Sequence, residues 1–158
     1  MKSNRSPSMK QTQSTEKVLV SACLLGYRCR YNAELLEVRT IPEPADAIVL
    51  VCPEELGSLP TPRPRSFFED EHTGADLVSG VGGRVITEAG EDLTSAFLAG
   101  ARRTLAIARE VGARKAYLKE RSPSCGCNTI YVQGEQSRGK GVTAALLEKN
   151  GIEIVPVE

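Results

Sequence analysis

Short apolar segments alternate with helical segments along this chain, and this alternation restricts the fold strongly. Four segments are rich in apolar residues and lack polar alternation, as expected of strands buried on both faces: 17–23, 45–52, 113–120 and 152–157. Helical periodicity begins after a cap at Asp92 or Thr94 and ends at Gly112, and a second helix is expected over 141–151. The pattern predicts an α/β fold, a single domain with a mostly parallel sheet flanked by helices on both faces.

The other segments are less regular. Residues 1–16 are polar and lack the apolar stretch of a secretory signal, so we expect a disordered tail before a domain that spans 17–158. The proline-rich segment 53–80 has no clear periodicity and is predicted to be a long functional or mobile loop. Three shorter elements are expected: a short helix at 32–39, a hairpin-like stretch at 82–92 and a brief extended piece at 129–132.

Composition narrows the classes of function. The chain has 158 residues, of which 41% are hydrophobic and 25% charged, and its formal net charge is zero. Binding to nucleic acid or to a membrane surface usually needs a basic surplus, so the charge argues against both partners. No apolar run approaches the roughly 20 residues that span a bilayer. A cytoplasmic protein without a membrane partner is therefore expected.

Cysteines follow three of the predicted strands. The chain has five cysteines, and in a reducing cytoplasm such residues are more often metal ligands or catalytic groups than disulfides. Cys23 ends the first strand, Cys52 ends the second, and Cys125 follows the third within the turn "SPSCG". Ligands bind at the carboxyl ends of strands in open α/β sheets, so we expect these three cysteines to meet at one site.

Three thiolates at one site need a compensating cation. Two unit charges about 6 Å apart repel by roughly 3 kcal/mol at an effective dielectric of 20. Three such pairs would cost about as much as the whole stability of a domain, about 5–15 kcal/mol. Either the thiols stay protonated or a metal offsets the charge, and thiolates select zinc, copper(I) or an iron–sulfur cluster.

The sequence leaves the roles of the other two cysteines open. Cys29 could be a ligand, a resolving thiol or a buried structural residue, and Cys127 could be a ligand or a structural residue.

Three other sequence features are candidate sites. "GEQSRGKG" (134–141) resembles a phosphate-binding loop but has glycine where serine or threonine would reach magnesium. It is predicted to be a mobile glycine turn, or a place where Lys140 and helix N–H groups meet an anion. His72, the only histidine, is predicted to be a solvated surface residue, which weakens any Cys–His chemistry. Arg63 and Arg65 either hold a carboxylate or phosphate or are surface charges.

Four motifs resemble the family long catalogued as domain of unknown function 523: "CLLGYRCRYN", "VCPEELGSLPTPRPR", "ERSPSCG" and "GKGVTAALLEKNGIEI". Its characterised members are thiouracil desulfidases, and the resemblance covers about residues 17–157. It implies that a [4Fe–4S] cluster removes sulfur from thiouracil or a related thiolated base, with one iron free to take the sulfur. Where the family often has "CRYDG" and "IYDG", this chain has "CRYNA" and "IYVQG".

The resemblance assigns roles residue by residue. It implies that three cysteines hold the cluster: Cys23, Cys52 and Cys125. It also implies acid–base roles for Glu54 and for a serine of "SPSC", with Ser122 preferred to Ser124. The expected partner is a small-molecule thiolated pyrimidine. The alternative function is a non-enzymatic module that binds zinc or an iron–sulfur cluster, or senses oxidants, through the same cysteines.

Overall fold

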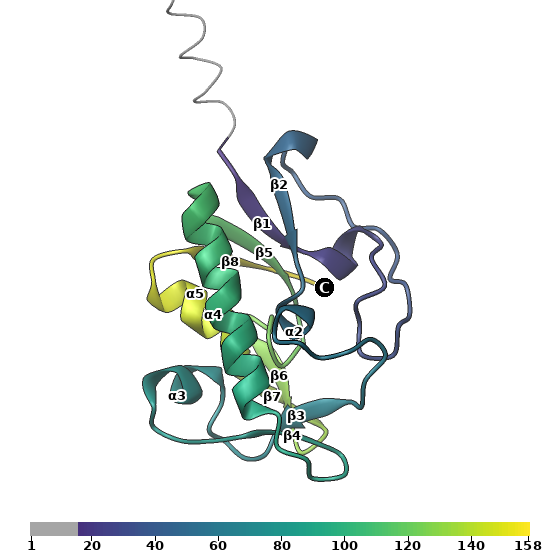
Figure 1. Ribbon diagram of the computed structural model, residues 1–158, viewed down its shortest axis with the longest axis vertical. Helices are drawn as coiled ribbons and strands as arrows, with labels where there is room; N and C mark the ends of the chain where they lie inside the picture. Colours follow the sequence, from purple (N-terminus) through teal and green to yellow (C-terminus); the bar gives the residue numbers. More distant parts are fainter. Residues whose placement is uncertain (1–15) are drawn as a thin grey trace, which may run out of the picture.

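The computed structural model describes residues 16–158 and has an α/β architecture with two four-stranded sheets (Figure 1). Apart from Glu16, the expected tail over 1–16 lies outside the described residues. Sheet A has the order β2-β1-β5-β8, and every neighbouring pair in it is parallel. Its strands are β1 (Val18–Ser21), β2 (Ile48–Val51), β5 (Lys115–Lys119) and β8 (Glu153–Val157). This sheet confirms the predicted α/β fold.

Two α-helices cover one face of sheet A, and a 3₁₀ helix together with irregular structure covers the other. Helix α4 (Thr94–Val111) buries Phe97, Ala101, Leu105 and Ala108, as its periodicity predicts, and α5 (Val142–Lys149) packs beside it. The opposite face packs against the 3₁₀ helix η1 (Ala22–Leu25) and Ile41, and a second 3₁₀ turn, η2 (Ala45–Ala47), precedes β2. No helix within residues 16–158 combines the length and apolarity needed to cross a bilayer.

The second sheet, sheet B, was not predicted from the sequence. It is mixed, with the order β4-β3-β6-β7, and its strands are β3 (Ser66–Phe68), β4 (Val85–Thr87), β6 (Thr129–Val132) and β7 (Glu135–Arg138). The expected glycine turn over 134–141 is therefore wrong, because β7 pairs antiparallel with β6. Gln133 and Gly134 join these strands with φ values of 50° and 82°, the positive values that two-residue hairpin turns favour.

Two other predictions between β1 and β4 are wrong. No helix forms over 32–39, where Leu35 and Val38 are 52% and 63% exposed and have no apolar face to pack against. The segment 53–80 is not one long loop. It contains α2 (Pro53–Leu56), β3 and α3 (Gly74–Ser79), each too short to show periodicity. The hairpin-like stretch is confirmed by β4 and an antiparallel bridge between Ile86 and Asp92.

A close contact between α2 and α4 fixes the segment that follows β2. A Cβ atom on Gly100 would lie 1.9 Å from the carbonyl oxygen of Pro53, and one on Gly57 would lie 2.2 Å from that of Ala96. Only glycine at both positions lets the two helix backbones approach this closely. Proline at the first position of α2 starts the helix without needing an N–H donor. The packing therefore holds α2 at the carboxyl end of β2.

Candidate active site

A pocket of about 370 Å³ opens at the carboxyl ends of the sheet A strands. Its lining includes Cys23, which follows β1, Cys52, which follows β2, and Cys125, which lies in the turn after β5. Parallel strands point their carboxyl ends the same way, so residues far apart in the sequence meet here, as the strand order predicts. Glu54, Ser122 and Ser124 line the same pocket.

The turn that carries Cys125 is shaped from inside by Ser122. The hydroxyl oxygen of Ser122 accepts the backbone N–H groups of Ser124 at 3.1 Å and of Cys125 at 3.0 Å. The N–H of Gly126 also donates to the carbonyl oxygen of Ser122, at 2.9 Å. These bonds are the local side-chain-to-backbone pattern typical of serine in turns. They present Cys125 at the rim of the sheet instead of in a strand.

The start of α5 holds the same turn from outside. The first three N–H groups of α5 donate to the carbonyl oxygens of Pro123 and Ser124 at 2.9 to 3.0 Å. Lys140, just before the helix, pairs with Glu148 at 3.4 Å. These contacts contradict the hypothesis that Lys140 and the helix N–H groups meet an anion, because the N–H groups already bind backbone oxygens.

Glu120 anchors the far side of the turn, and sequence reasoning missed this role. Its side chain is buried, and Oε1 accepts the backbone N–H groups of Cys127, Asn128 and Thr129 at 2.7, 3.0 and 3.2 Å. Burial alone would raise the pKa of Glu120, but these N–H groups outweigh burial and hold the pKa below its ordinary value. The carboxylate therefore ties the end of β5 to the segment that follows Cys125.

We expect Glu120→Gln to lower the free energy of unfolding at pH 7 by about 1–3 kcal/mol, because a buried charge-assisted set of hydrogen bonds becomes neutral. The folded-state pKa lies below the unfolded value, so the stabilisation is present above about pH 4.3 and is lost as pH falls through the folded-state pKa. Urea denaturation between pH 7 and pH 3 should show the difference from wild type shrinking at low pH. Glu135→Gln, on the exposed strand β7, is the control. A difference independent of pH would contradict this account.

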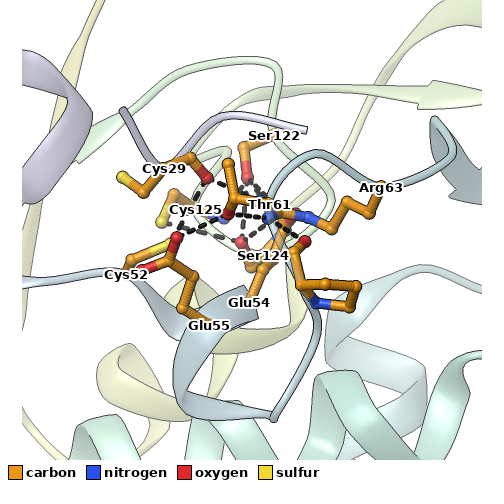
Figure 2. Close-up of polar contacts among 10 residues, drawn as sticks. Cys29, Cys52, Glu54, Glu55, Thr61, Arg63, Ser122, Ser124 and Cys125 are labelled. Atoms are coloured by element: carbon orange, nitrogen blue, oxygen red, sulfur yellow. Dashed lines mark hydrogen bonds and ion pairs between the residues drawn. The ribbon is translucent and has the colours of Figure 1, made fainter. Parts of the chain in front are cut away.

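The carboxylate of Glu54 lies between an arginine and two serines (Figure 2). Glu54 is 9% exposed. Its Oε1 lies 2.9 Å from Nε and 2.8 Å from Nη2 of Arg63. Ser124 donates its hydroxyl to Oε2 at 3.0 Å, and Oγ of Ser122 lies 3.5 Å from the same oxygen. One carboxylate oxygen is thus held by a cation, and the other faces hydroxyl groups.

The two serines have different surroundings. Their Oγ atoms are 2.9 Å apart. Because the oxygen of Ser122 accepts two backbone N–H groups, its own hydrogen is left to donate to Ser124. Ser124 in turn donates to Glu54, and its Oγ lies 3.8 Å from Sγ of Cys125. Ser124 therefore links the carboxylate to the cysteine, whereas Ser122 mainly holds the turn.

The thiols of Cys52 and Cys125 hold their protons tightly. Burial raises the pKa of Cys125 to about 12. Contact with the thiol of Cys29, together with burial, raises the pKa of Cys52 above its ordinary value. All five cysteines of the chain are free thiols. Neutral thiols at these two positions avoid the repulsion expected of thiolates, and a bound cation would reverse this preference.

The remaining two cysteines lie in different places. Cys29 is buried, lines the pocket and packs with Cys23 and Cys52. Contact with the thiol of Cys23 is the main cause that raises the pKa of Cys29 to about 12. Cys127 is buried but does not line the pocket, and its Sγ lies 3.7 Å from the carbonyl oxygen of Cys125. Of the two, Cys29 is the one that belongs to the pocket.

Of the other residues singled out in the sequence, Arg63 and Arg65 line the pocket and His72 does not. Arg63 holds a carboxylate, one of its two expected roles, whereas the guanidinium of Arg65 lies over the ring of Tyr131, 4.7 Å from its centre. His72 is partly exposed beside Asp70, with Nδ1 3.0 Å from Oδ1. The buried position of Arg63 left no signal in "TPRPR", because proline-rich sequence has no periodicity from which to infer burial.

The donor set determines which group could fit the pocket. In residues 16–158, no group of three or more His, Cys, Asp or Glu side chains is arranged to hold a single metal ion. A [4Fe–4S] cluster is several ångströms across, so its ligands stand further apart than the ligands of one ion. Cysteine sulfur is also the ligand that such clusters take. The four thiols that line the pocket, those of Cys23, Cys29, Cys52 and Cys125, fit a cluster in donor type.

The chain belongs to a family of desulfurases. A family model described as 2-thiouracil desulfurase matches residues 18–158, which confirms the family expected from the four motifs. Among solved structures, the chain is similar to the [4Fe–4S]-dependent thiouracil desulfidase TudS (DUF523Vcz). The two are 37% identical, with a TM-score of 0.77 over 89% of this chain and 90% of TudS. This chain is also 41% identical over 145 residues to "Uncharacterized protein YbbK" of Bacillus subtilis (strain 168). The match covers 87% of this chain and 93% of YbbK.

Proposed function

We propose that this protein is a [4Fe–4S]-dependent desulfidase that removes sulfur from thiouracil or a related thiolated base and releases sulfide. The observation that carries the proposal is one pocket where strand-end thiols lie beside a buried carboxylate and a serine hydroxyl. The pocket volume of about 370 Å³ falls in the range of small-molecule sites. Membership of the 2-thiouracil desulfurase family and the likeness to TudS support the same reaction.

The proposed cluster ligands are Cys23, Cys52 and Cys125, one from the end of each neighbouring strand of sheet A. A cluster held by three cysteines supplies an open iron that can act as a Lewis acid toward the sulfur of the substrate. Cys127 is left out of the ligand set because it does not line the pocket, whereas Cys125 does. The pocket wall of Tyr31, Arg65 and Tyr131 is where a planar pyrimidine would lie.

Glu54 is the proposed proton carrier. Exchange of C=S for C=O uses one water and releases one sulfide, with no electrons transferred. Both protons of the water must leave its oxygen, and the sulfur departs as hydrogen sulfide, so protons must move from the water side to the sulfur. A carboxylate with one oxygen held by Arg63 and the other facing the pocket hydroxyls can take up and return such a proton at Oε2.

Ser124 is the proposed hydroxyl partner of Glu54. The family resemblance favoured Ser122, but the oxygen of Ser122 is engaged by two backbone N–H groups. Ser124 lies between Oε2 of Glu54 and Sγ of Cys125, so its hydroxyl can pass a proton between the carboxylate and the substrate. Ser122 supports this role by donating to Ser124 and by holding the turn.

The proposed partner is a small thiolated pyrimidine, and the proposed compartment is the cytoplasm. All five cysteines are free thiols, and a reducing compartment keeps thiols in that state. A small base also needs no extended basic surface, in keeping with a formal net charge of zero.

Anaerobic reconstitution with iron and sulfide, followed by incubation with 2-thiouracil, tests the proposal. We expect brown protein with the iron and acid-labile sulfide of one cluster per chain, and release of sulfide that requires this iron. Apoprotein and protein incubated with zinc are the controls, and both should leave the substrate unchanged. Uptake of one zinc per chain with no iron, or iron-loaded protein that releases no sulfide, would support the non-enzymatic alternative.

A further inference from the structure

Arg63 is an arginine buried at the wall of the pocket, and its whole guanidinium group is engaged. Its side chain is 4% exposed. Nε and Nη2 face Oε1 of Glu54 at 2.9 and 2.8 Å, and Nη2 also donates to the carbonyl oxygen of Cys29 at 2.7 Å. Nη1 donates to the carbonyl oxygen of Pro60 at 2.9 Å and to Oγ1 of Thr61 at 2.8 Å. All five N–H groups of the guanidinium therefore have an acceptor.

The contact with Glu54 is one-sided. Both arginine nitrogens bind Oε1, so Oε2 is left to the hydroxyl of Ser124. In Figure 2, Arg63 reaches Glu54 from the side opposite to the sulfur atoms of Cys52 and Cys125. The arrangement fixes the rotation of the carboxylate and directs one oxygen toward the reacting side of the pocket. A lysine at this position could not do the same, because an ammonium is a single point donor.

Arg63 also joins the loop that carries Cys29 to the segment that carries Cys52. Its side chain bonds to the carbonyl oxygen of Cys29, and its backbone N–H donates to the carbonyl oxygen of Tyr31 at 2.7 Å. The carbonyl oxygen of Cys29 also accepts the thiol of Cys52 at 3.7 Å. The same guanidinium thus ties the loop after η1 to α2, which begins directly after Cys52 and carries Glu54.

We propose that Arg63 is a positioning residue for the desulfuration: it binds Oε1 of Glu54, so that Oε2 is presented to Ser124 and to the substrate. The inference rests on the proposed function. Arg63 acts through Glu54 and does not touch the substrate. Its removal therefore lowers the rate only while Glu54 is able to carry a proton. That dependence separates a positioning role from a general structural role.

A double-mutant cycle on the reconstituted enzyme tests the inference, using Arg63→Gln, Glu54→Gln and the double variant. We expect Arg63→Gln to keep its iron content, to lower kcat by about 10²-fold and to change KM by less than about threefold. In the Glu54→Gln background, the same change should alter kcat by less than about threefold. Arg103→Gln is the matched control, because Arg103 also bonds to α2, through the carbonyl oxygen of Leu56, but does so outside the pocket.

Three results would overturn the inference: an unchanged kcat in Arg63→Gln, loss of iron in that variant, or an equal loss of kcat in both backgrounds. If Arg63→Gln does not fold, Arg63→Lys replaces it in the test, because lysine keeps the positive charge but loses the paired N–H donors of the guanidinium. A lower kcat that disappears in the Glu54→Gln background supports positioning, and any other result contradicts it. If iron-loaded wild type releases no sulfide, the proposed function fails as well. If wild type is active, only the role of Arg63 is at stake.

Discussion

Replacing Cys125 with alanine is expected to abolish both cluster binding and sulfide release. Cys125 lies in a turn held by Ser122, by Glu120 and by the start of α5, so its sulfur is fixed at the rim of sheet A. No other cysteine lines the pocket from the end of β5, because Cys127 is buried outside the pocket lining. A cluster left with two cysteine ligands should be lost during reconstitution.

Cys127→Ala is the matched control for Cys125→Ala. Both changes remove one buried sulfur from the same turn, and each should cost about 0.5–3 kcal/mol of stability. Only Cys125→Ala should lose the iron and acid-labile sulfide measured after anaerobic reconstitution. Equal loss of iron in the two variants would show that the assignment of Cys125 as the ligand is wrong.

Glu54→Gln is expected to keep the cluster and lose turnover. Glutamine has nearly the same size and can still accept a hydrogen bond from Arg63, but it cannot take up or return a proton. Loss of one general acid–base group typically lowers a rate by about 10²–10⁴-fold. Sulfide release under saturating thiouracil measures kcat, and iron content measured on the same sample shows that the cluster remains.

Glu55→Gln is the control for Glu54→Gln. Glu55 is the next residue of α2, is exposed, and accepts a hydrogen bond from Thr61 instead of facing the serines. It should retain full turnover. Because Glu54→Gln leaves the buried Arg63 without a negative partner, its unfolding must also be measured; breaking a buried pair costs about 3–5 kcal/mol. Folded, iron-loaded Glu54→Gln with near-normal kcat would show that another group carries the proton.

The parallel sheet and the meeting of its strand-end cysteines could be predicted from the sequence because both depend on patterns within single elements. Strands β1 and β5 each contain a run of three buried apolar residues, 18–20 and 116–118, and α4 shows its buried face over eighteen residues. Once the strands are parallel, their carboxyl ends share an edge, and Cys23, Cys52 and Cys125 follow to that edge. This part of the site needed no knowledge of side-chain contacts.

Sheet B and the environment of Glu54 could not be predicted because they depend on contacts between distant segments. Strands of three or four residues are too short for an alternating pattern to distinguish them from loop. Ser124 meets Glu54 across seventy residues of sequence, and Arg63 meets Cys29 across thirty-four. A buried arginine and a buried glutamate look like surface charges until the fold supplies their partners.

Hydrolysis of 2-thiouracil in ¹⁸O-labelled water tests the central claim most directly. The reconstituted enzyme, kept anaerobic and given no reductant or oxidant, should produce uracil that carries one ¹⁸O atom and should release one sulfide for each uracil formed. Mass spectrometry of the uracil and quantitation of the sulfide measure both values. Unlabelled uracil, sulfur released in another oxidation state, or turnover that requires an added reductant would contradict a non-redox exchange of sulfur for oxygen in this pocket.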